Sequence, residues 1–210
     1  MLRYLYGDQL CNHPKLADSM FRDRAAQFHD RLGWEVTVDD RGWERDEYDD
    51  LNPLYVIWET EDGSHGGSMR FLPTTGQTMV NDHFVDLMDG VQLQSPFIWE
   101  CTRFCLNPKA EGRVAAALML AGGELMRAFD VRHFVGVFDA RMVRIYSMIG
   151  SSPDILGQVG EGRDMIAVGL WAYDDAARDR VARRADIPPE LSEKWFVSSF
   201  GFAPRLQLVA

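Results

Sequence analysis

The stretch "WECTRFCL" (residues 99–106) has the composition of a buried β-strand, yet it carries a charged pair in its middle. Aromatic, cysteine and leucine side chains fill most of it, and the preceding "QSPFI" is largely apolar as well, which favours a central strand over 97–106. Glu100 and Arg103 interrupt this run. Burying a carboxylate or a guanidinium group costs free energy unless the group is paired or used in a site.

The strict alternation of a β-strand separates the two charges of this stretch. In a regular strand Glu100 shares a face with Thr102 and Phe104, whereas Arg103 lies on the opposite face. Both side chains can serve one site only if the strand is irregular, and bulges are over-represented beside active sites. We therefore predict a bulge or a splay near residues 101–102.

Upstream of the strand, residues 14–33 are predicted to form a helix. Pro14 is typical of a first helical position and Gly33 of a position just past the end. Arg24 occupies the missing step of an apolar stripe, one turn from its neighbours on either side. The other members of that stripe are Leu16, Met20, Phe28 and Leu32.

The remaining patterns predict a chain in which helices alternate with strands. A short strand and an acidic loop are expected after Trp34, then a hairpin from 54–61 and 66–73. Beyond the central strand we expect a helix over 110–129, strands over 132–139 and 165–173, a helix over 140–149, and a helical tail broken at Pro188-Pro189. This order predicts an α/β fold, a three-layer α-β-α sandwich around a mixed central sheet, in a single domain over residues 1–210.

Composition restricts the class of protein and of partner. The chain has 210 residues, of which 46% are hydrophobic and 26% charged, as in soluble globular domains. A formal net charge of -10 disfavours nucleic acid as the main partner, and no apolar run reaches membrane-spanning length. The first ten residues lack the pattern of a signal peptide, and three cysteines suit a reducing compartment, so we expect a cytoplasmic protein.

Charged residues that break local rules are the candidates for a functional site. Singly, each has an ordinary explanation, because acidic loops are usually solvated and an arginine on an apolar helix face often extends to water. Together they supply three guanidinium groups and four carboxylates that can pair around one cleft. They are Arg24, Glu44, Asp46, Asp49, Arg70, Glu100 and Arg103.

These residues, in this order, resemble the acyl-homoserine-lactone synthases, the LuxI-type autoinducer synthases. The resemblance rests on "MFRDRAAQFHDRLGW" (20–34), "ERDEYD" (44–49), Arg70, Phe84 and "ECTRF" (100–104). It covers roughly the first half of the chain. Beyond residue 110 only the succession of helices and strands is similar.

The resemblance implies a fold similar to the N-acetyltransferases and a specific reaction. In that family the α-amine of S-adenosylmethionine attacks an acyl thioester, and the methionine carboxylate then closes onto its γ-carbon. The products are an acyl-homoserine lactone, which is a quorum-sensing signal, and methylthioadenosine. S-adenosylmethionine is thus a substrate, and no separate cofactor or metal is implied. By position Arg24, Phe28 and Trp34 line its site, and the other charged residues order the cleft.

The chemistry of the residues agrees with that reaction. Glu100 is a sensible acceptor for the proton of the amine, directly or through a water. Arg24 is a candidate partner for the methionine carboxylate, although an acid of the 44–49 loop is the other possible partner. Phe28 and Trp34 offer aromatic faces to the sulfonium or the adenine, while core packing is their alternative explanation.

The acyl donor is less defined by the sequence. The resemblance places Phe84 and Phe138 in the acyl pocket. Synthases that prefer 3-oxo chains resemble one another in carrying a threonine on the strand that here reads "HFVGVFDAR" (133–141), so we expect an unsubstituted or 3-hydroxy chain. The thioester is carried by acyl carrier protein or by CoA. For an acidic carrier protein, Arg141 and Arg144 are the expected docking residues, with Lys109 and Arg113 next.

Four alternatives stay open at this stage. A generic N-acyltransferase using CoA is disfavoured because "NPKAEGRVAAA" (107–117) lacks the Q/R-x-x-G-x-G/A spacing of a pyrophosphate loop. A cysteine acyl-enzyme would use Cys101 or Cys105 with His83 or His133. A metal site has no supporting histidine spacing. A non-catalytic sensor would bind S-adenosylmethionine without releasing methylthioadenosine.

Overall fold

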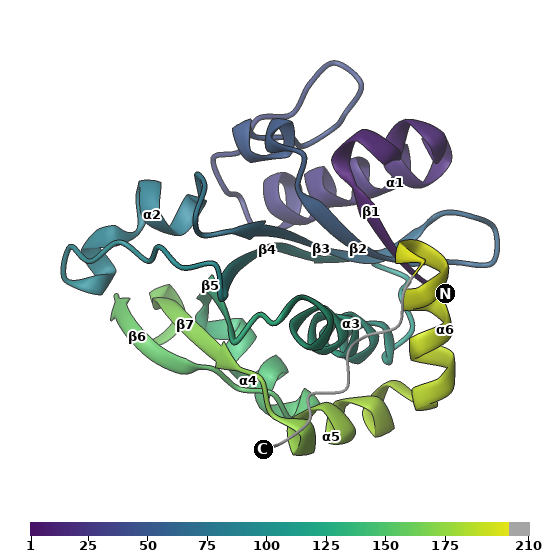
Figure 1. Ribbon diagram of the computed structural model, residues 1–210. Helices are drawn as coiled ribbons and strands as arrows, with labels where there is room; N and C mark the ends of the chain where they lie inside the picture. Colours follow the sequence, from purple (N-terminus) through teal and green to yellow (C-terminus); the bar gives the residue numbers. More distant parts are fainter. Residues whose placement is uncertain (202–210) are drawn as a thin grey trace.

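The computed structural model describes residues 1–201 and contains a seven-stranded sheet in the order β1-β2-β3-β4-β5-β7-β6 (Figure 1). Only β4 and β5 pair in parallel, so the sheet is mixed, as expected. Residues 202–210 of the expected domain lie outside the described part. The strands are β1 (Leu2–Tyr6), β2 (Leu54–Glu59), β3 (His65–Pro73), β4 (Ile98–Leu106), β5 (His133–Asp139), β6 (Asp154–Val159) and β7 (Ile166–Ala172).

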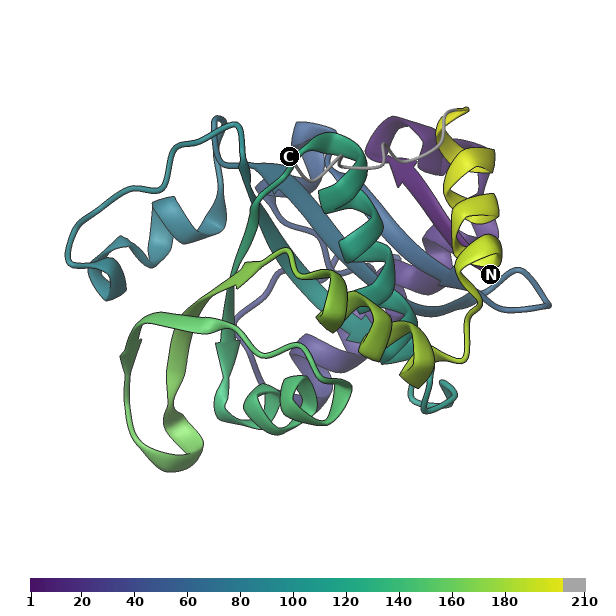
Figure 2. The ribbon, with the colours of Figure 1, turned by 60° about the horizontal axis from the view of Figure 1, so that its bottom comes forward.

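Helices cover both faces of the sheet, which confirms the predicted three-layer sandwich. Helix α1 lies on one face of β1–β4, and α3, α5 and α6 lie on the opposite face (Figures 1 and 2). Within residues 1–201, no helix has both the length and the apolar character that crossing a membrane requires. The helices are α1 (Pro14–Arg24), α2 (Met79–His83), α3 (Val114–Phe129), α4 (Ala140–Ile149), α5 (Asp175–Ala185) and α6 (Pro189–Phe200).

The helix expected over 14–33 forms, but it changes pitch at Arg24. Its α-helical part ends there, and a π-helical segment continues from Ala25 to Arg31. The apolar stripe buries Leu16 and Met20 against the sheet, as its spacing predicts. Segments of π-helix are frequently found at functional sites, and this one carries Phe28.

Several elements were not predicted, and some of them have a clear physical reason. Strand β6 is an exposed edge strand, so it lacks the apolar run of a buried strand and depends on its pairing with β7. The helical tail is interrupted before Pro188-Pro189, as expected, but a second helix that was not predicted, α6, begins at Pro189, where proline suits the first turn. The strand expected after Trp34 is reduced to an isolated bridge between Val38 and Glu44, followed by a 3₁₀ turn over Glu47–Leu51. Strand β1 and the short helix α2 were also missed.

The irregularity predicted for the central strand is present, slightly later than expected. The register between β3 and β4 shifts because β4 has one extra residue between Thr102 and Cys105. Arg103 there has φ +53°, in the left-handed region that non-glycine residues rarely adopt. In addition, β4 pairs with β5 only over residues 98–100, so the two strands part beyond Glu100. The bulge brings Arg103 to the side of the acidic loop.

Candidate active site

Six of the seven charged residues singled out in the sequence form a closed ring in which arginines and carboxylates alternate. Each arginine pairs with two carboxylates, and each carboxylate with two arginines, so the ring carries no net charge. Helix α1, the acidic loop, β3 and β4 supply its members. In order around the ring they are Arg24, Glu44, Arg103, Asp46, Arg70 and Asp49.

Arg24 is fully committed to this ring. Its Nε donates to Glu44 at 2.6 Å, and its two terminal nitrogens donate to the two oxygens of Asp49 at 3.0 and 2.9 Å. The residue is 1% exposed. Of the two partners considered for Arg24, the structure shows the acidic loop. A direct contact with a substrate carboxylate stays a prediction, and it would require the ring to open.

Arg70 and Arg103 complete the ring in different ways. Arg70 is completely buried, donates to Asp49 at 2.8 Å and to Asp46 at 2.9 Å, and uses its Nε for the hydroxyl of Thr102. Arg103 pairs with Asp46 at 2.7 Å and with Glu44 at 2.9 Å, but one terminal nitrogen meets only the sulfur of Met79. Arg103 is therefore the arginine of the ring with a donor to spare.

The ring keeps the carboxylate of Asp49 ionised despite its burial. Burial alone would raise the pKa of Asp49, but the guanidinium groups of Arg24 and Arg70 outweigh it and hold that pKa well below the usual range. The hydroxyl of Tyr55 on β2 also donates to Asp49. Sequence reasoning missed Tyr55, because a tyrosine in an apolar strand is equally typical of core packing.

Glu100 stays outside the ring and holds the start of α2. Its carboxylate accepts the backbone N–H of Met79 at 3.1 Å and that of Val80 at 2.6 Å, and the residue is 1% exposed. Burial raises the pKa of Glu100 to about 7, although the two backbone hydrogen bonds and Arg70 oppose that shift. The carboxylate thus titrates near neutral pH, behind the cavity that α2 borders.

A cavity of about 620 Å³ lies beside the ring, between the π-helical segment, the acidic loop, α2, β4, β5 and α4. Phe28 and Trp34 stack in its wall with ring centroids 5.2 Å apart and planes at 14°. The guanidinium group of Arg103 lies over the Phe28 ring at 5.4 Å. Phe84 and Phe138 line this cavity too. The structure therefore brings Phe28, Trp34 and the predicted charged residues together.

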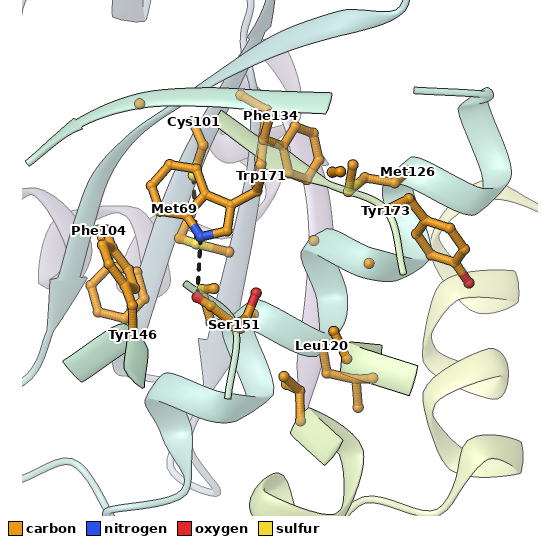
Figure 3. A pocket seen from close by; sticks show the side chains of 18 of the residues that line it. Met69, Cys101, Phe104, Leu120, Met126, Phe134, Tyr146, Ser151, Trp171 and Tyr173 are labelled. Carbon is orange, nitrogen blue, oxygen red and sulfur yellow. Dashed lines mark hydrogen bonds between the residues drawn. The ribbon is translucent and has the colours of Figure 1, made fainter. Parts of the chain in front are cut away.

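A second, smaller cavity of about 110 Å³ lies on the α3 side of the sheet (Figure 3). The indole of Trp171 on β7 fixes part of its wall by donating to the backbone oxygen of Ser151 at 3.1 Å. Much of the remaining lining is apolar, including Met69, Cys101, Leu120, Met126 and Phe134. These residues were not predicted, because nothing in an apolar pattern distinguishes a cavity wall from a filled core.

The two cavities meet where β4 and β5 part. Five residues line both, namely Thr102, Arg103, Phe104, Val137 and Tyr146. Phe84 and Phe138, expected in the acyl pocket, line only the larger cavity. Their role in acyl binding stays a prediction, whereas the apolar cavity is made of other side chains.

Neither candidate cysteine is in a setting that favours a thiolate. Burial raises the pKa of Cys105 to about 12, and burial raises that of Cys101 as well. The sulfur of Cys101 contacts that of Met69 at 3.7 Å, and His83 lies near Glu47 on the surface. The geometry thus gives the acyl-enzyme hypothesis no support. Within residues 1–201, no cluster of three His, Cys, Asp or Glu side chains is arranged to hold a metal ion.

The expected docking residues lie at the surface. Arg141 and Arg144 are exposed on α4, and Arg141 borders the larger cavity while pairing with Asp139 at 3.2 Å. Lys109 is exposed, and Arg113 pairs with Glu111 at 2.7 Å. Docking itself stays a prediction for both pairs.

Comparison with known proteins gives consistent matches. Residues 8–181 match the family model described as autoinducer synthase. The acyl-homoserine-lactone synthase of Rhizobium etli is 42% identical over 178 residues, which cover 81% of this chain and 84% of that protein. The probable acyl-homoserine-lactone synthase of Sinorhizobium fredii is 35% identical over 187 residues, covering 85% of this chain and 87% of that protein.

Solved structures show the same architecture. The crystal structure of the acyl-homoserine-lactone synthase LasI superposes with a TM-score of 0.75 at 26% identity, covering 86% of this chain and 93% of that one. BjaI, a CoA-dependent acyl-homoserine lactone synthase solved with S-adenosylmethionine and isopentyl-CoA, gives 0.79 at 20% identity and 90% coverage of both chains. A putative N-acetyltransferase from Lactobacillus plantarum gives 0.56 at 14% identity, covering 82% of this chain and 99% of that one, so the N-acetyltransferase-like fold is confirmed.

Proposed function

The chain belongs to the autoinducer synthase family and is an acyl-homoserine-lactone synthase, and from that premise we propose how its residues divide the reaction. The enzyme joins the α-amine of S-adenosylmethionine to an acyl group from a thioester donor. Lactone closure then releases methylthioadenosine. The product is a quorum-sensing signal.

S-adenosylmethionine binds in the larger cavity. The observation that carries this proposal is the stacked pair Phe28 and Trp34 beside Arg103, in a cavity of about 620 Å³ bordered by acidic residues. The aromatic faces suit the sulfonium or the adenine. Arg103, with a donor to spare, takes the methionine carboxylate, and Arg24 supports it from within the ring. Asp46, at the cavity wall, suits the cationic groups of the substrate.

Glu100 accepts the proton that the attacking amine loses. A base whose pKa is about 7 is matched to the physiological range, which favours proton transfer at neutral pH. The carboxylate lies behind Met79 and does not line the cavity, so the transfer passes through a water. No resident cofactor is required, because the two bond-forming steps need only positioning and acid–base chemistry.

The acyl thioester lies where β4 and β5 part, with its chain in the apolar cavity. The two cavities share five wall residues at the point where the strands part, which supports a path from one cavity to the other. The donor is acyl carrier protein or acyl-CoA, and Arg141 with Arg144 is the docking patch if it is the acidic carrier protein. The three free cysteines support a cytoplasmic location.

One experiment tests these assignments. The protein is incubated with S-adenosylmethionine and matched acyl carrier protein and acyl-CoA donors, and lactone and methylthioadenosine are identified by mass. The proposed function predicts both products in equal amounts, whereas a sensor would bind S-adenosylmethionine and release neither. The double variant R141E/R144E should lower turnover with the carrier protein and spare acyl-CoA, and salt should slow the wild type with the carrier protein only. Equal loss with both donors would exclude the docking patch.

A further inference from the structure

Tyr146 on α4 occupies the junction of the two cavities. It lines both of them and is 7% exposed. Phe138 and Trp171 hold its ring in edge-to-face contacts. The centroid distance to Phe138 is 5.4 Å with an interplanar angle of 89°, and the distance to Trp171 is 5.0 Å with an angle of 79°. Figure 3 shows the ring beside Phe104, on the side of Trp171 away from Met126. A side chain fixed in this way has a defined position in the path of the acyl chain.

Within residues 1–201 the hydroxyl of Tyr146 makes no hydrogen bond, and its oxygen is accessible rather than sealed in the core. Of the other polar side chains at the junction, Thr102 accepts from Arg70 at 3.0 Å, and Arg103 pairs with two carboxylates of the ring and has its spare donor beside Met79 in the larger cavity. A phenol hydroxyl can donate one hydrogen bond and accept another, so an accessible one without a protein partner is free to bind a polar group of the substrate. Burial, with smaller contributions from Cys101 and Asp139, raises the pKa of Tyr146, so the phenol stays neutral and able to donate.

We propose that the Tyr146 hydroxyl binds an oxygen on the third carbon of the acyl chain, so that the donor is a 3-hydroxyacyl or a 3-oxoacyl thioester. This inference rests on the proposed function. The thioester carbonyl must reach the amine in the larger cavity, and the end of the chain lies in the apolar cavity. A hydroxyl at the junction therefore faces the carbons between them. The sequence expectation of an unsubstituted or 3-hydroxy chain relied on a missing threonine in β5, whereas this hydroxyl comes from α4.

The volume of the apolar cavity determines the acyl-chain length of the donors that test this proposal. Its volume of about 110 Å³ is somewhat smaller than the roughly 150 Å³ cavity that admits benzene, so it accommodates about five carbons. With three carbons at the junction, an eight-carbon donor fills the path. The probes are octanoyl, 3-hydroxyoctanoyl and 3-oxooctanoyl thioesters on the carrier that the wild type uses.

The variant Y146F removes only the hydroxyl. We expect kcat/KM to fall about 10- to 100-fold with at least one 3-substituted donor, because a group that pairs with the phenol is left unpaired. The octanoyl donor should change by less than about threefold, and the donor with the larger loss identifies the C3 group. Tyr173 provides a matched control, because it lines the same cavity but its hydroxyl donates to Asp175 at 2.7 Å. Y173F should treat all three donors alike.

The ratio between donors is measured within one preparation, so any inactive fraction of a variant cancels. Equal losses of Y146F with all three donors would overturn the inference, since the hydroxyl would then serve the thioester that they share. Unchanged rates with all three would overturn it as well. A wild type that makes lactone while Y146F shows no selectivity contradicts this inference alone. A wild type that makes no lactone from any donor contradicts the proposed function instead.

Discussion

The two cavities of this enzyme differ in what holds their walls in place. The wall of the larger includes Glu44, Asp46 and Arg103 of the ring, each held by two partners of opposite sign. The smaller is bordered mainly by apolar side chains, among them the flexible methionines Met69, Met119 and Met126. Charges in a closed ring have little freedom to shift, whereas apolar walls adapt to volume. The difference suits a rigid site for the constant substrate and an adaptable one for the acyl chain.

The largest effect is expected from Arg70→Ala, which tests whether the ring of buried charges stabilises the fold. Arg70 is completely buried and pairs with Asp46 and Asp49, so its removal leaves two carboxylates without their shared counter-ion. Breaking a buried charge network of this kind costs about 3–5 kcal/mol of unfolding free energy. Urea denaturation at pH 7 measures it.

Arg22→Ala is the matched control for that variant. Arg22 is about half exposed and pairs with Asp18 one helical turn away, an arrangement worth no more than about 0.5 kcal/mol. If Arg70→Ala were no more destabilising than Arg22→Ala, the ion pairs of the ring would contribute no more to stability than an exposed pair, and the ring would not be rigid.

The second prediction concerns Glu100, whose carboxylate is buried like the ring but lacks a guanidinium partner. Its pKa in the folded protein is raised from 4.5 to about 7, so ionisation opposes folding. Stability contributed by the protonated form is therefore lost as pH rises from about 4.5 to about 7, at most roughly 3.5 kcal/mol at 1.4 kcal/mol per unit. Glu100→Gln should remove this dependence and, as loss of a general base, lower turnover by about 10²–10⁴-fold.

Denaturation midpoints at pH 5 and pH 8, together with rates of methylthioadenosine release, test both parts. The wild type should lose more stability than Glu100→Gln between the two pH values. Near-normal turnover of the variant would reduce Glu100 to the group that holds the start of α2, where it accepts two backbone N–H groups. A stability difference that does not change with pH would show that the carboxylate is ionised throughout.

The sequence revealed the charged half of the site better than the apolar half. A charge inside an apolar run, such as Arg24 or Glu100, contradicts its local pattern and is visible without a structure. That the charges close into a ring depends on the left-handed Arg103 and on the fold of the acidic loop, which no local pattern specifies. Tyr55 and Tyr146 agree with their local patterns, so nothing marked them as special.

The predictable parts of the fold are the elements that bury an apolar face. Strands β2–β5 and helix α3 bury apolar faces, and their periodicity predicted them. Strand β6 is exposed along almost its whole length and exists because β7 provides hydrogen bonds, a cause that lies outside its own residues. The apolar cavity is an absence of side-chain atoms, which no local pattern reveals, and Gly122 and Gly123 of α3 lie in its wall.

That glycine pair gives the smallest and sharpest test of the apolar cavity. Both glycines line it, and a glycine inside a helix costs about 0.5–1 kcal/mol relative to alanine. A Cβ on Gly123 would meet only the Arg178 side chain at 3.8 Å, an ordinary contact, so Gly123→Ala should raise the unfolding free energy by about that amount. A Cβ on Gly122 would lie 3.3 Å from the Phe134 ring, which is tight, so Gly122→Ala should gain less or nothing.

The two variants should also differ in acyl-chain preference. The methyl group of Gly122→Ala, directed at Phe134 and Met69, takes up room for about one methylene, worth about 0.8 kcal/mol or roughly fourfold in rate. In competition between butanoyl and octanoyl donors, this variant should therefore shift about fourfold towards butanoyl. Gly123→Ala should keep the wild-type ratio, because its methyl faces Arg178. An identical shift in both variants would mean that the helix moves as a whole and that the cavity does not measure chain length at Gly122. A shift in Gly123→Ala alone would place the end of the acyl chain beside Arg178 instead.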